Sequence, residues 1–364
     1  MNCCENCFED EEIVQIIRSG QRYGDCDFCG ARDVLIYNLD QGNDIEELFN
    51  NVLDIYTPIN VLPCNFPRMK TDLIKNIIHD KWGFFNRNFN NEDVYRMLTG
   101  ICKRRYEIQP DLFDSPVGIK EIEDHTVLAE NAILKGGSWK EFVEDIKYKS
   151  RFHGNYLNLT QLLKFVNCTK VECKKGEVFF RSRVCDNPEG YSSDQMGAPP
   201  KDKVKSGRLN PEGISVLYLS DDPETTFYEV RAGVYDYVSL GKFELLKDIS
   251  VADLTRIDQI SPFVVAQSQL NIDLFQYAIN IDCLRQISAE IARPLRFENV
   301  LDYLPTQYIC DFIRSNGFDG VRYKSVMREG VGNNLAVFDE TNLQCINVEV
   351  HDVSHISYSH NKCK

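Results

Sequence analysis

The hydrophobic pattern between residues 44 and 165 is that of a helical region. In residues 44–56, apolar side chains recur three or four positions apart, at Ile45, Leu48, Phe49, Val52, Leu53 and Tyr56. This spacing places them on one face of a helix. Residues 72–79 and 92–102 carry similar stripes, and Ser138-Trp-Lys-Glu141 is a capping box that predicts a helix toward Tyr148. We therefore predict a helical, bundle-like domain over residues 36–165, with a short strand at 34–37 before its first helix.

The pattern changes near residue 166, where short apolar runs replace the helical stripes. Strands are predicted at residues 176–181, 214–219, 238–246, 249–253, 318–323, 335–338 and 345–350. Helices are predicted at residues 262–279, 283–292 and 303–315. Because strands begin and end this region with helices between them, we predict an α+β domain over residues 166–364. Residues 186–205 have no apolar stripe and form either a cover over a pocket or a surface insertion.

One stretch of this second domain combines a loop cation with a helix carboxylate. Residues 207–213 are rich in Gly, Asn and Pro, which predicts a loop around Arg208 before the apolar strand 214–219. Ser220-Asp-Asp-Pro223 then offers capping oxygens and a proline suited to the first turn of a helix that contains Glu229. Arg208 and Glu229 thus flank one buried strand, either as parts of a substrate site or as partners in a surface salt bridge.

Five motifs, in order along the chain, resemble the RES family, which is named for its arginine, glutamate and serine. They are Phe179-Phe-Arg-Ser-Arg183, Gly207-Arg-Leu-Asn-Pro211 with Leu217-Tyr218, Glu229, Gly320-Val-Arg-Tyr-Lys-Ser325 and Asn333-Asn-Leu-Ala-Val-Phe338. The family is known from bacterial toxin–antitoxin modules and related effectors, and the resemblance implies a sheet core akin to ADP-ribosyltransferases. It also implies consumption of NAD as substrate, by hydrolysis, by phosphorolysis or by ADP-ribosylation of a protein target. A RES-type binding or sensor protein without activity is the alternative.

The chemistry of NAD cleavage suggests roles for these residues. Nicotinamide leaves as a neutral base through an oxocarbenium-like transition state, so a carboxylate near the ribose stabilises the growing positive charge. Arginines hold pyrophosphate by forked hydrogen bonds, which suits Arg181 and Arg208. We predict a catalytic set of Glu229, Arg181 and Ser325 and a substrate-binding set of Arg208, Tyr218, Tyr323 and Asn334.

Arg181 and Arg183 compete for one position in this site. The family's arginine follows directly on the apolar pair, here Phe179-Phe180, which favours Arg181. We expect Arg181 to face the pocket, and Arg183 to point to the other face of the strand and make a structural ion pair.

The N-terminal cysteines are spaced as metal ligands. Cys4-Glu-Asn-Cys7 and Cys26-Asp-Phe-Cys29 form the pattern C-x2-C-x18-C-x2-C, which lies within the spacing of four-thiolate zinc sites. This predicts a zinc-binding knuckle over residues 1–35, with Cys3 as a substitute for Cys4 and free thiols as the alternative. We expect a structural role, because four thiolates leave no open coordination position.

Length and charge limit the class of protein. A chain of 364 residues is expected to hold more than one domain. The net charge of −14 argues against a nucleic-acid binder, which normally has a basic face. The acidic N-terminus lacks the apolar core of a secretion signal, and no run approaches the ~20 apolar residues of a membrane helix. We therefore expect a soluble, cytoplasmic protein.

The helical half resembles the HEPN-type N-terminal domains that accompany RES regions. HEPN ribonucleases carry an arginine followed a few residues later by a histidine. Here Arg151 and His153 are too close together, and His125 has no arginine at the required distance. We therefore expect no nuclease activity from this half. Its expected partners are a protein inhibitor or antitoxin, a trigger protein, or a second copy of the chain.

Overall fold

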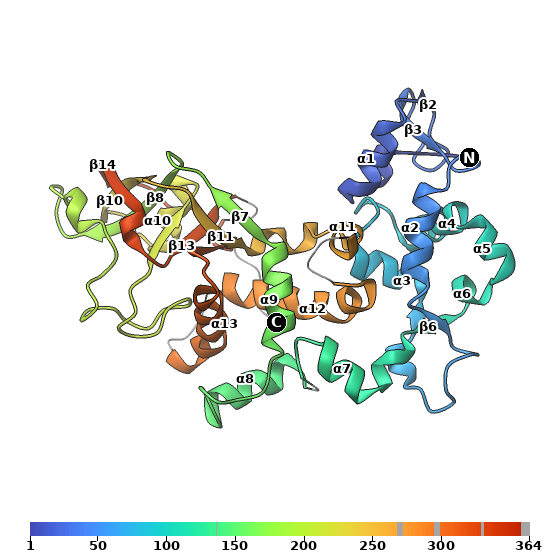
Figure 1. The fold of residues 1–364 in the computed structure, drawn as a ribbon. Coiled ribbons are helices and arrows are strands. Elements are labelled where there is room, and N and C mark those ends of the chain that lie inside the picture. Colours follow the sequence, from blue (N-terminus) through green and yellow to red (C-terminus); the bar gives the residue numbers. More distant parts are fainter. Residues whose placement is uncertain (136, 268–271, 295–298, 329–330, 358–364) are drawn as a thin grey trace. The chain divides into compact units, whose positions relative to one another are not determined.

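The chain folds into two units that each draw on separate stretches of sequence (Figure 1). The structure is a computed structural model and describes residues 1–135, 137–267, 272–294, 299–328 and 331–357. The first unit consists of residues 1–137, 155–164 and 258–284, and the second of residues 138–154, 165–257 and 285–364. Among the described residues, none of the helices has the length and apolar character needed to cross a membrane.

Two small antiparallel sheets lie in the first unit. One has the order β1-β3-β2 and contains β1 (Asn2–Cys4), β3 (Val34–Asn38) and β2 (Tyr23–Gly24). Strand β3 confirms the strand predicted at residues 34–37. The other has the order β4-β6-β5 and contains β4 (Thr57–Pro58), β6 (Pro116–Gly118) and β5 (Asp72–Leu73).

The helices of the first unit form at the predicted apolar stripes. The stripe at residues 44–56 becomes α2 (Asp44–Leu53), and that at 92–102 becomes α4 (Asn91–Ile101). The predicted helix at 72–79 begins instead with strand β5 and turns helical at Ile74, as α3 (Ile74–Ile77) followed by the π-helical turn η3 (Ile78–Trp82). The other helical segments are α1 (Glu11–Ser19), α5 (Lys103–Ile108), α6 (Asp111–Asp114), α7 (His125–Asn131), α11 (Pro262–Gln267) and the 3-10 turns η1 (Glu5–Cys7), η2 (Arg68–Lys70) and η4 (Lys120–Glu123).

The second unit is built on one eight-stranded mixed sheet of order β14-β10-β8-β9-β13-β12-β11-β7 (Figure 1). Its strands are β7 (Lys170–Cys173), β8 (Val178–Cys185), β9 (Leu217–Ser220), β10 (Tyr237–Leu245), β11 (Ile249–Asp253), β12 (Gly320–Lys324), β13 (Asn333–Val337) and β14 (Leu343–Asp352). Strands β11 and β12 are parallel, and the other neighbouring pairs are antiparallel. This mixture of helices with a large sheet confirms the predicted class at that level.

The second unit contains the predicted capping box. It opens α8 (Trp139–Tyr148), where the hydroxyl of Ser138 accepts from the N–H of Glu141 and the Glu141 carboxylate accepts from the N–H of Ser138. The other helical segments are α10 (Pro223–Glu229), α13 (Leu304–Ser315), η5 (Ser193–Gln195), η6 (Leu254–Gln259), η7 (Val300–Tyr303) and η8 (Glu340–Asn342). Helices α9 (Leu159–Cys168) and α12 (Leu274–Ala292) and the turn η6 contribute residues to both units.

Helix α12 differs from the prediction of two helices at 262–279 and 283–292. The first of these divides into α11 and the start of α12, with residues 268–271 outside the described part of the chain, and α12 then continues to Ala292. Asn280, which interrupts the apolar stripe, is buried. Its amide group donates to the carbonyl of Asn131 at 2.8 Å and accepts from the N–H of Ile133 at 2.7 Å. A satisfied polar side chain therefore lies inside a continuous helix.

The two faces of the large sheet differ in character. One face, the core face, is apolar and includes Phe179, Met196 from the following loop, Leu217, Leu219, Phe243, Val251, Leu335 and Val337. Residues that alternate with these strand positions form the polar face, defined here by Ser182, Tyr218, Ser220, Tyr323 and Asn334. Helix α10 lies on the polar face, because the hydroxyl groups of Ser182 and Thr226 are 2.6 Å apart. The polar face carries most of the residues predicted for the site.

Candidate active site

Glu229 is the last residue of α10, and two side chains hold its carboxylate. Asp222 caps the helix by accepting from the N–H of Thr225 at 2.7 Å. Oε1 of Glu229 accepts hydrogen bonds from the hydroxyl of Ser325 at 2.8 Å and from Nδ2 of Asn334 at 2.6 Å. Ser325 and Asn334 are buried, and Glu229 is half-buried. The structure thus brings three predicted site residues together at one carboxylate oxygen.

Tyr323 lies beside Asn334, and Arg208 lies beside the ring of Tyr323. Tyr323 is the register partner of Asn334 on the neighbouring strand, and the Arg208 guanidinium stands 5.6 Å from the centroid of its ring. Burial raises the pKa of the Tyr323 hydroxyl; Arg208 acts in the opposite direction and Glu229 in the same one. The charges of Arg208 and Glu229 therefore both affect the pKa of the Tyr323 hydroxyl.

The guanidinium of Arg208 is also held by the C-terminal end of α12. Its Nη1 donates to the carbonyl groups of Ile291 at 3.1 Å and Ala292 at 2.8 Å. These are the last residues of α12, where carbonyl groups have no partner within the helix and where the helix dipole favours a cation. An arginine has five N–H donors, so the remaining ones stay available for an anion.

The loop that contains Arg208 is anchored by α13, a contact that the sequence analysis missed. Nε2 of Gln307 donates to the carbonyl groups of Gly207 at 2.7 Å and Asn210 at 2.9 Å, and the Thr306 hydroxyl donates to the carbonyl of Arg208 at 2.7 Å. Thr306 and Gln307 are both buried. Two adjacent polar residues in the helical stripe of α13 were the signal that could have indicated this anchor.

The hydroxyl of Tyr218 is engaged within the protein. It donates to Oδ1 of Asn210 at 2.7 Å and accepts from the N–H of Leu209 at 3.1 Å. Burial raises its pKa, so the group is a neutral phenol at physiological pH. Tyr218 therefore holds the Arg208 loop in place from the polar face.

Arg181 is not brought together with Glu229. It stands two positions from Phe179 on β8, and alternate residues of a strand share a face, so its side chain leaves from the core face. Its Nη1 donates to the carbonyl of Met196 at 2.9 Å and to that of Gly197.

The expectation that Arg183 faces the other way from Arg181 is wrong. The two residues are alternate positions of β8 and therefore share the core face. Arg183 donates to the carbonyl of Gln195, and its guanidinium lies 4.0 Å from the centroid of the Tyr191 ring. Within the described residues it has no ion pair of the kind expected. Both arginines fasten the 186–205 loop to the sheet.

The four predicted metal ligands lie together in the first unit. The Sγ atoms of Cys4, Cys7, Cys26 and Cys29 are all within 4.8 Å of one another, and the first three residues are buried. Such a cluster of thiols can hold a metal ion.

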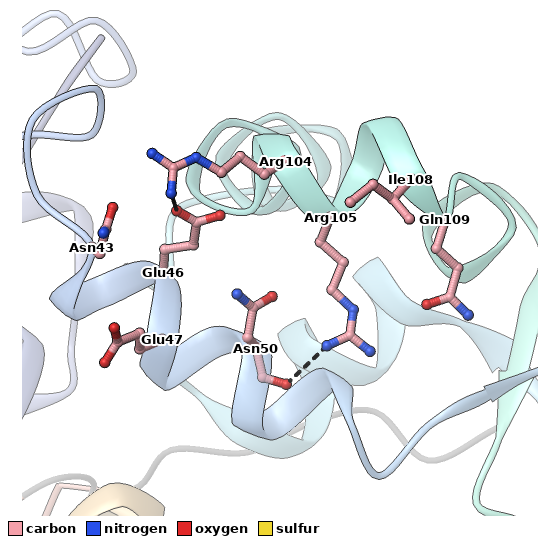
Figure 2. Close-up of a pocket in the computed structure, with 8 residues that line it drawn as sticks. All are labelled: Asn43, Glu46, Glu47, Asn50, Arg104, Arg105, Ile108 and Gln109. Carbon is pink, nitrogen blue, oxygen red and sulfur yellow. Dashed lines mark hydrogen bonds and ion pairs between the residues drawn. The ribbon is translucent and has the colours of Figure 1, made fainter.

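The basic run at residues 103–105 borders a pocket of about 490 Å³ between α2 and α5 in the first unit (Figure 2). Its arginines are engaged with acidic and carbonyl groups. Arg104 pairs with Glu46 at 4.0 Å, and Arg105 pairs with Asp54 and donates to the carbonyl of Asn50. These partners neutralise the arginines, so the pocket is not a basic patch.

Comparison with known proteins identifies the class of the second unit. Residues 182–361, which contain strands β9 to β14 of the large sheet and the carboxylate of Glu229, match the family model of the RES domain. This match confirms the resemblance to RES domains over these residues. Among solved structures, the chain is similar to the crystal structure of the M. tuberculosis MbcT–MbcA toxin–antitoxin complex. The sequence identity is 14% and the TM-score 0.32, and the match covers 54% of this chain and 93% of that chain. No curated protein matches the sequence.

Proposed function

We propose that the RES domain cleaves the bond between nicotinamide and ribose in NAD, as a glycohydrolase or phosphorylase. The main support is the half-buried carboxylate of Glu229, which Ser325 and Asn334 orient through one oxygen. Among the described residues, its other oxygen, Oε2, accepts no hydrogen bond and is free to face a ligand. A fixed negative charge beside the ribose is the group that this reaction requires most.

In the proposed reaction, the bond between C1′ of the nicotinamide ribose and the nicotinamide nitrogen breaks. The nitrogen takes the electron pair, and nicotinamide leaves as a neutral base without protonation. Positive charge grows on C1′ and the ring oxygen, and Glu229 stabilises it. Water or phosphate then bonds to C1′ and gives ADP-ribose, with release of a proton, or phosphorylated ADP-ribose.

The residues around Glu229 have the chemistry to bind the rest of NAD. Arg208 offers its unused N–H donors to the pyrophosphate, and its guanidinium makes a cation–π contact with the Tyr323 ring. Ser325 is close enough to Glu229 to orient the ribose as well. Arg181 is left out of this binding site, because it lies on the core face.

RES domains are known from toxin–antitoxin modules, and this supports a biological role for the reaction. We propose that NAD depletion in the cytoplasm makes the protein a toxin, kept inactive by a protein inhibitor. Transfer of ADP-ribose to a protein is the alternative outcome of the same bond cleavage. Mass analysis separates the two, because hydrolysis gives free ADP-ribose and transfer gives a protein of increased mass.

The substitution Glu229→Gln tests the role of the carboxylate, since it removes the charge and keeps the size. We expect kcat for nicotinamide release to fall about a hundredfold, equivalent to ~3 kcal/mol of transition-state stabilisation, with KM little changed. Glu224→Gln is the matched control: it is the same change on the same helix, at an exposed residue paired with Arg328 at 2.9 Å. We expect it to retain kcat within about twofold.

Two outcomes would contradict the proposal. Unchanged turnover in Glu229→Gln would exclude this carboxylate from the mechanism. A wild-type protein that binds NAD without releasing nicotinamide would instead indicate the inactive binding protein.

A further inference from the structure

Four cysteines of the first unit, Cys4, Cys7, Cys26 and Cys29, have thiols close enough together to surround one metal ion. The Sγ atoms are 3.4 Å apart for Cys4 and Cys29, 3.5 Å for Cys7 and Cys26, and 3.7 Å for Cys4 and Cys7. Zinc bonded to four sulfurs at about 2.3 Å requires sulfur–sulfur distances of roughly 3.8 Å. A disulfide requires about 2.05 Å, so the four groups are thiols gathered around one point.

The backbone brings the two pairs together by separate means. Cys4 ends β1 and Cys7 ends the following turn η1. Cys26 and Cys29 lie in a turn closed by Gly30, whose N–H donates to the carbonyl of Cys26 at 3.2 Å. Gly30 has a φ of 74°, a left-handed conformation that glycine adopts without strain.

Contacts with β1 then hold the second turn in place. The N–H of Asp27 donates to the carbonyl of Asn2 at 2.9 Å, and the N–H of Asn2 donates to the Asp27 carboxylate at 2.7 Å. Hydrogen bonds between Asn2 and Asp27 therefore hold the two cysteine pairs close together.

We infer that Cys4, Cys7, Cys26 and Cys29 bind one zinc ion as thiolates, and that this ion is structural. Four protein ligands fill a tetrahedral site and leave no position for water or substrate. Cys3 is not part of the site, because its thiol lies 3.8 Å from the carbonyl of Tyr37 as a hydrogen-bond donor.

The turn that contains Cys26 and Cys29 also contacts α4. Phe28 stands between Cys26 and Cys29 in the sequence, and the centroid of its ring lies 5.3 Å from the guanidinium of Arg96 on α4. Arg96 also donates to the carbonyl of Asp27. A Cβ atom on Gly100 of α4 would clash with the Phe28 ring at 2.9 Å, so the ring is packed closely against the helix. Loss of the metal should therefore release this turn from α4 and lower the stability of the first unit.

Elemental analysis of the full-length protein, purified without chelator, tests the inference. We expect about one zinc per chain in the wild type and at least a tenfold loss in Cys26→Ser and Cys29→Ser. Cys64→Ser is the matched control, because Cys64 is an exposed thiol outside the cluster and its variant should keep the metal. Wild-type protein without zinc, or with iron in its place, would overturn the assignment.

A second measurement does not require the variants to fold. Titration of the wild type with a mercurial reagent should release zinc as the cluster thiols react, and cobalt loaded in its place should show the absorption of a four-thiolate site. A chelator should lower the melting temperature of the wild type and of Cys64→Ser. A melting temperature unaffected by complete zinc removal would overturn the structural role. None of these readouts depends on NAD cleavage.

Discussion

At the residue scale, Arg181 is a cation held inside the second unit by backbone carbonyl groups. Burial, with a smaller contribution from neighbouring Arg183, lowers the pKa of Arg181 to about 10, against an opposing effect of Glu340. A buried charge costs free energy unless hydrogen bonds satisfy it. The carbonyl groups of Met196 and Gly197 supply such bonds. The side chain therefore fastens the 186–205 loop to the core face.

Arg181→Met should reduce stability and spare catalysis. The change leaves two carbonyl groups without their donor, and we expect a loss of about 1–3 kcal/mol in the free energy of unfolding, measured with urea. Nicotinamide release by the folded variant should stay within a few-fold of wild type. Arg208→Ala, on the polar face, is the comparison: it should raise KM for NAD about tenfold or more. An Arg181→Met protein as stable as wild type but without activity would return Arg181 to the catalytic set.

The sequence predicted the residues that meet at Glu229 better than it predicted the sheet face on which Arg181 lies. Glu229, Ser325 and Asn334 come from three separate motifs, and only the family resemblance suggested that they meet. Arg181 stands in a motif as well, but strand alternation links it to Phe179 and hence to the core. The face of a strand is set by what packs on each side of the sheet, and here α10 packs on Ser182.

At the element scale, α10 depends on its cap. A helix of this length is not stable alone, and Oδ2 of Asp222 accepts from the N–H of Thr225 at 2.7 Å, from its hydroxyl at 2.6 Å and from Arg328 at 2.8 Å. Burial alone would raise the pKa of Asp222, but the bonds from Thr225 and Arg328 outweigh it and hold the pKa below the usual 3.8. Glu229 lies at the other end of this helix.

Asp222→Ala should destabilise the second unit by about 1–2 kcal/mol at neutral pH, and by less in acid. A carboxyl group whose pKa is lowered by folding binds fewer protons in the folded state. Its contribution is therefore full above the unfolded pKa of 3.8 and is lost as the pH falls through the lower, folded value. Urea unfolding at several pH values checks this. Asp222→Asn keeps a capping acceptor and should lose less than Asp222→Ala at neutral pH. A difference between wild type and Asp222→Ala that stays constant into acid would contradict it.

The bounds of a strand could be predicted where the local apolar pattern sets them. They could be predicted less well where pairing with a distant strand sets them. Strand β11 occupies the predicted residues, Ile249–Asp253. Strand β9 begins at Leu217, although the apolar run begins at residue 214, because its ladder with β13 extends only from Leu217 to Ser220. A strand ends where its neighbour ends, and the neighbour here is more than a hundred residues away in the sequence.

At the scale of the whole molecule, the first unit includes a segment from the middle of the RES region. Residues 258–284 belong to it. Phe263 stacks on Phe84 with ring centroids 4.9 Å apart, and Tyr277 stacks on Trp82 at 5.3 Å. Apolar periodicity predicted that these residues are buried, but it carries no information about which part of the chain buries them. A single cut near residue 165, where the pattern changes, would therefore detach residues 258–284 from the rest of the first unit.

Dividing the chain into residues 1–164 and 165–364 should consequently leave neither fragment properly folded. The first loses the rings of Phe263 and Tyr277 from its core, and the second exposes them to water. Removing one such aromatic group costs about 3–5 kcal/mol, against a total stability of roughly 5–15 kcal/mol for a domain. Each fragment alone should bind a hydrophobic dye and melt without a cooperative transition, whereas co-expression should restore one complex with a single sharp transition. The control is full-length Phe263→Ala, which should fold with a lower melting temperature. If residues 165–364 alone form a monomer that melts cooperatively and releases nicotinamide at the full rate, then residues 258–284 do not need the first unit.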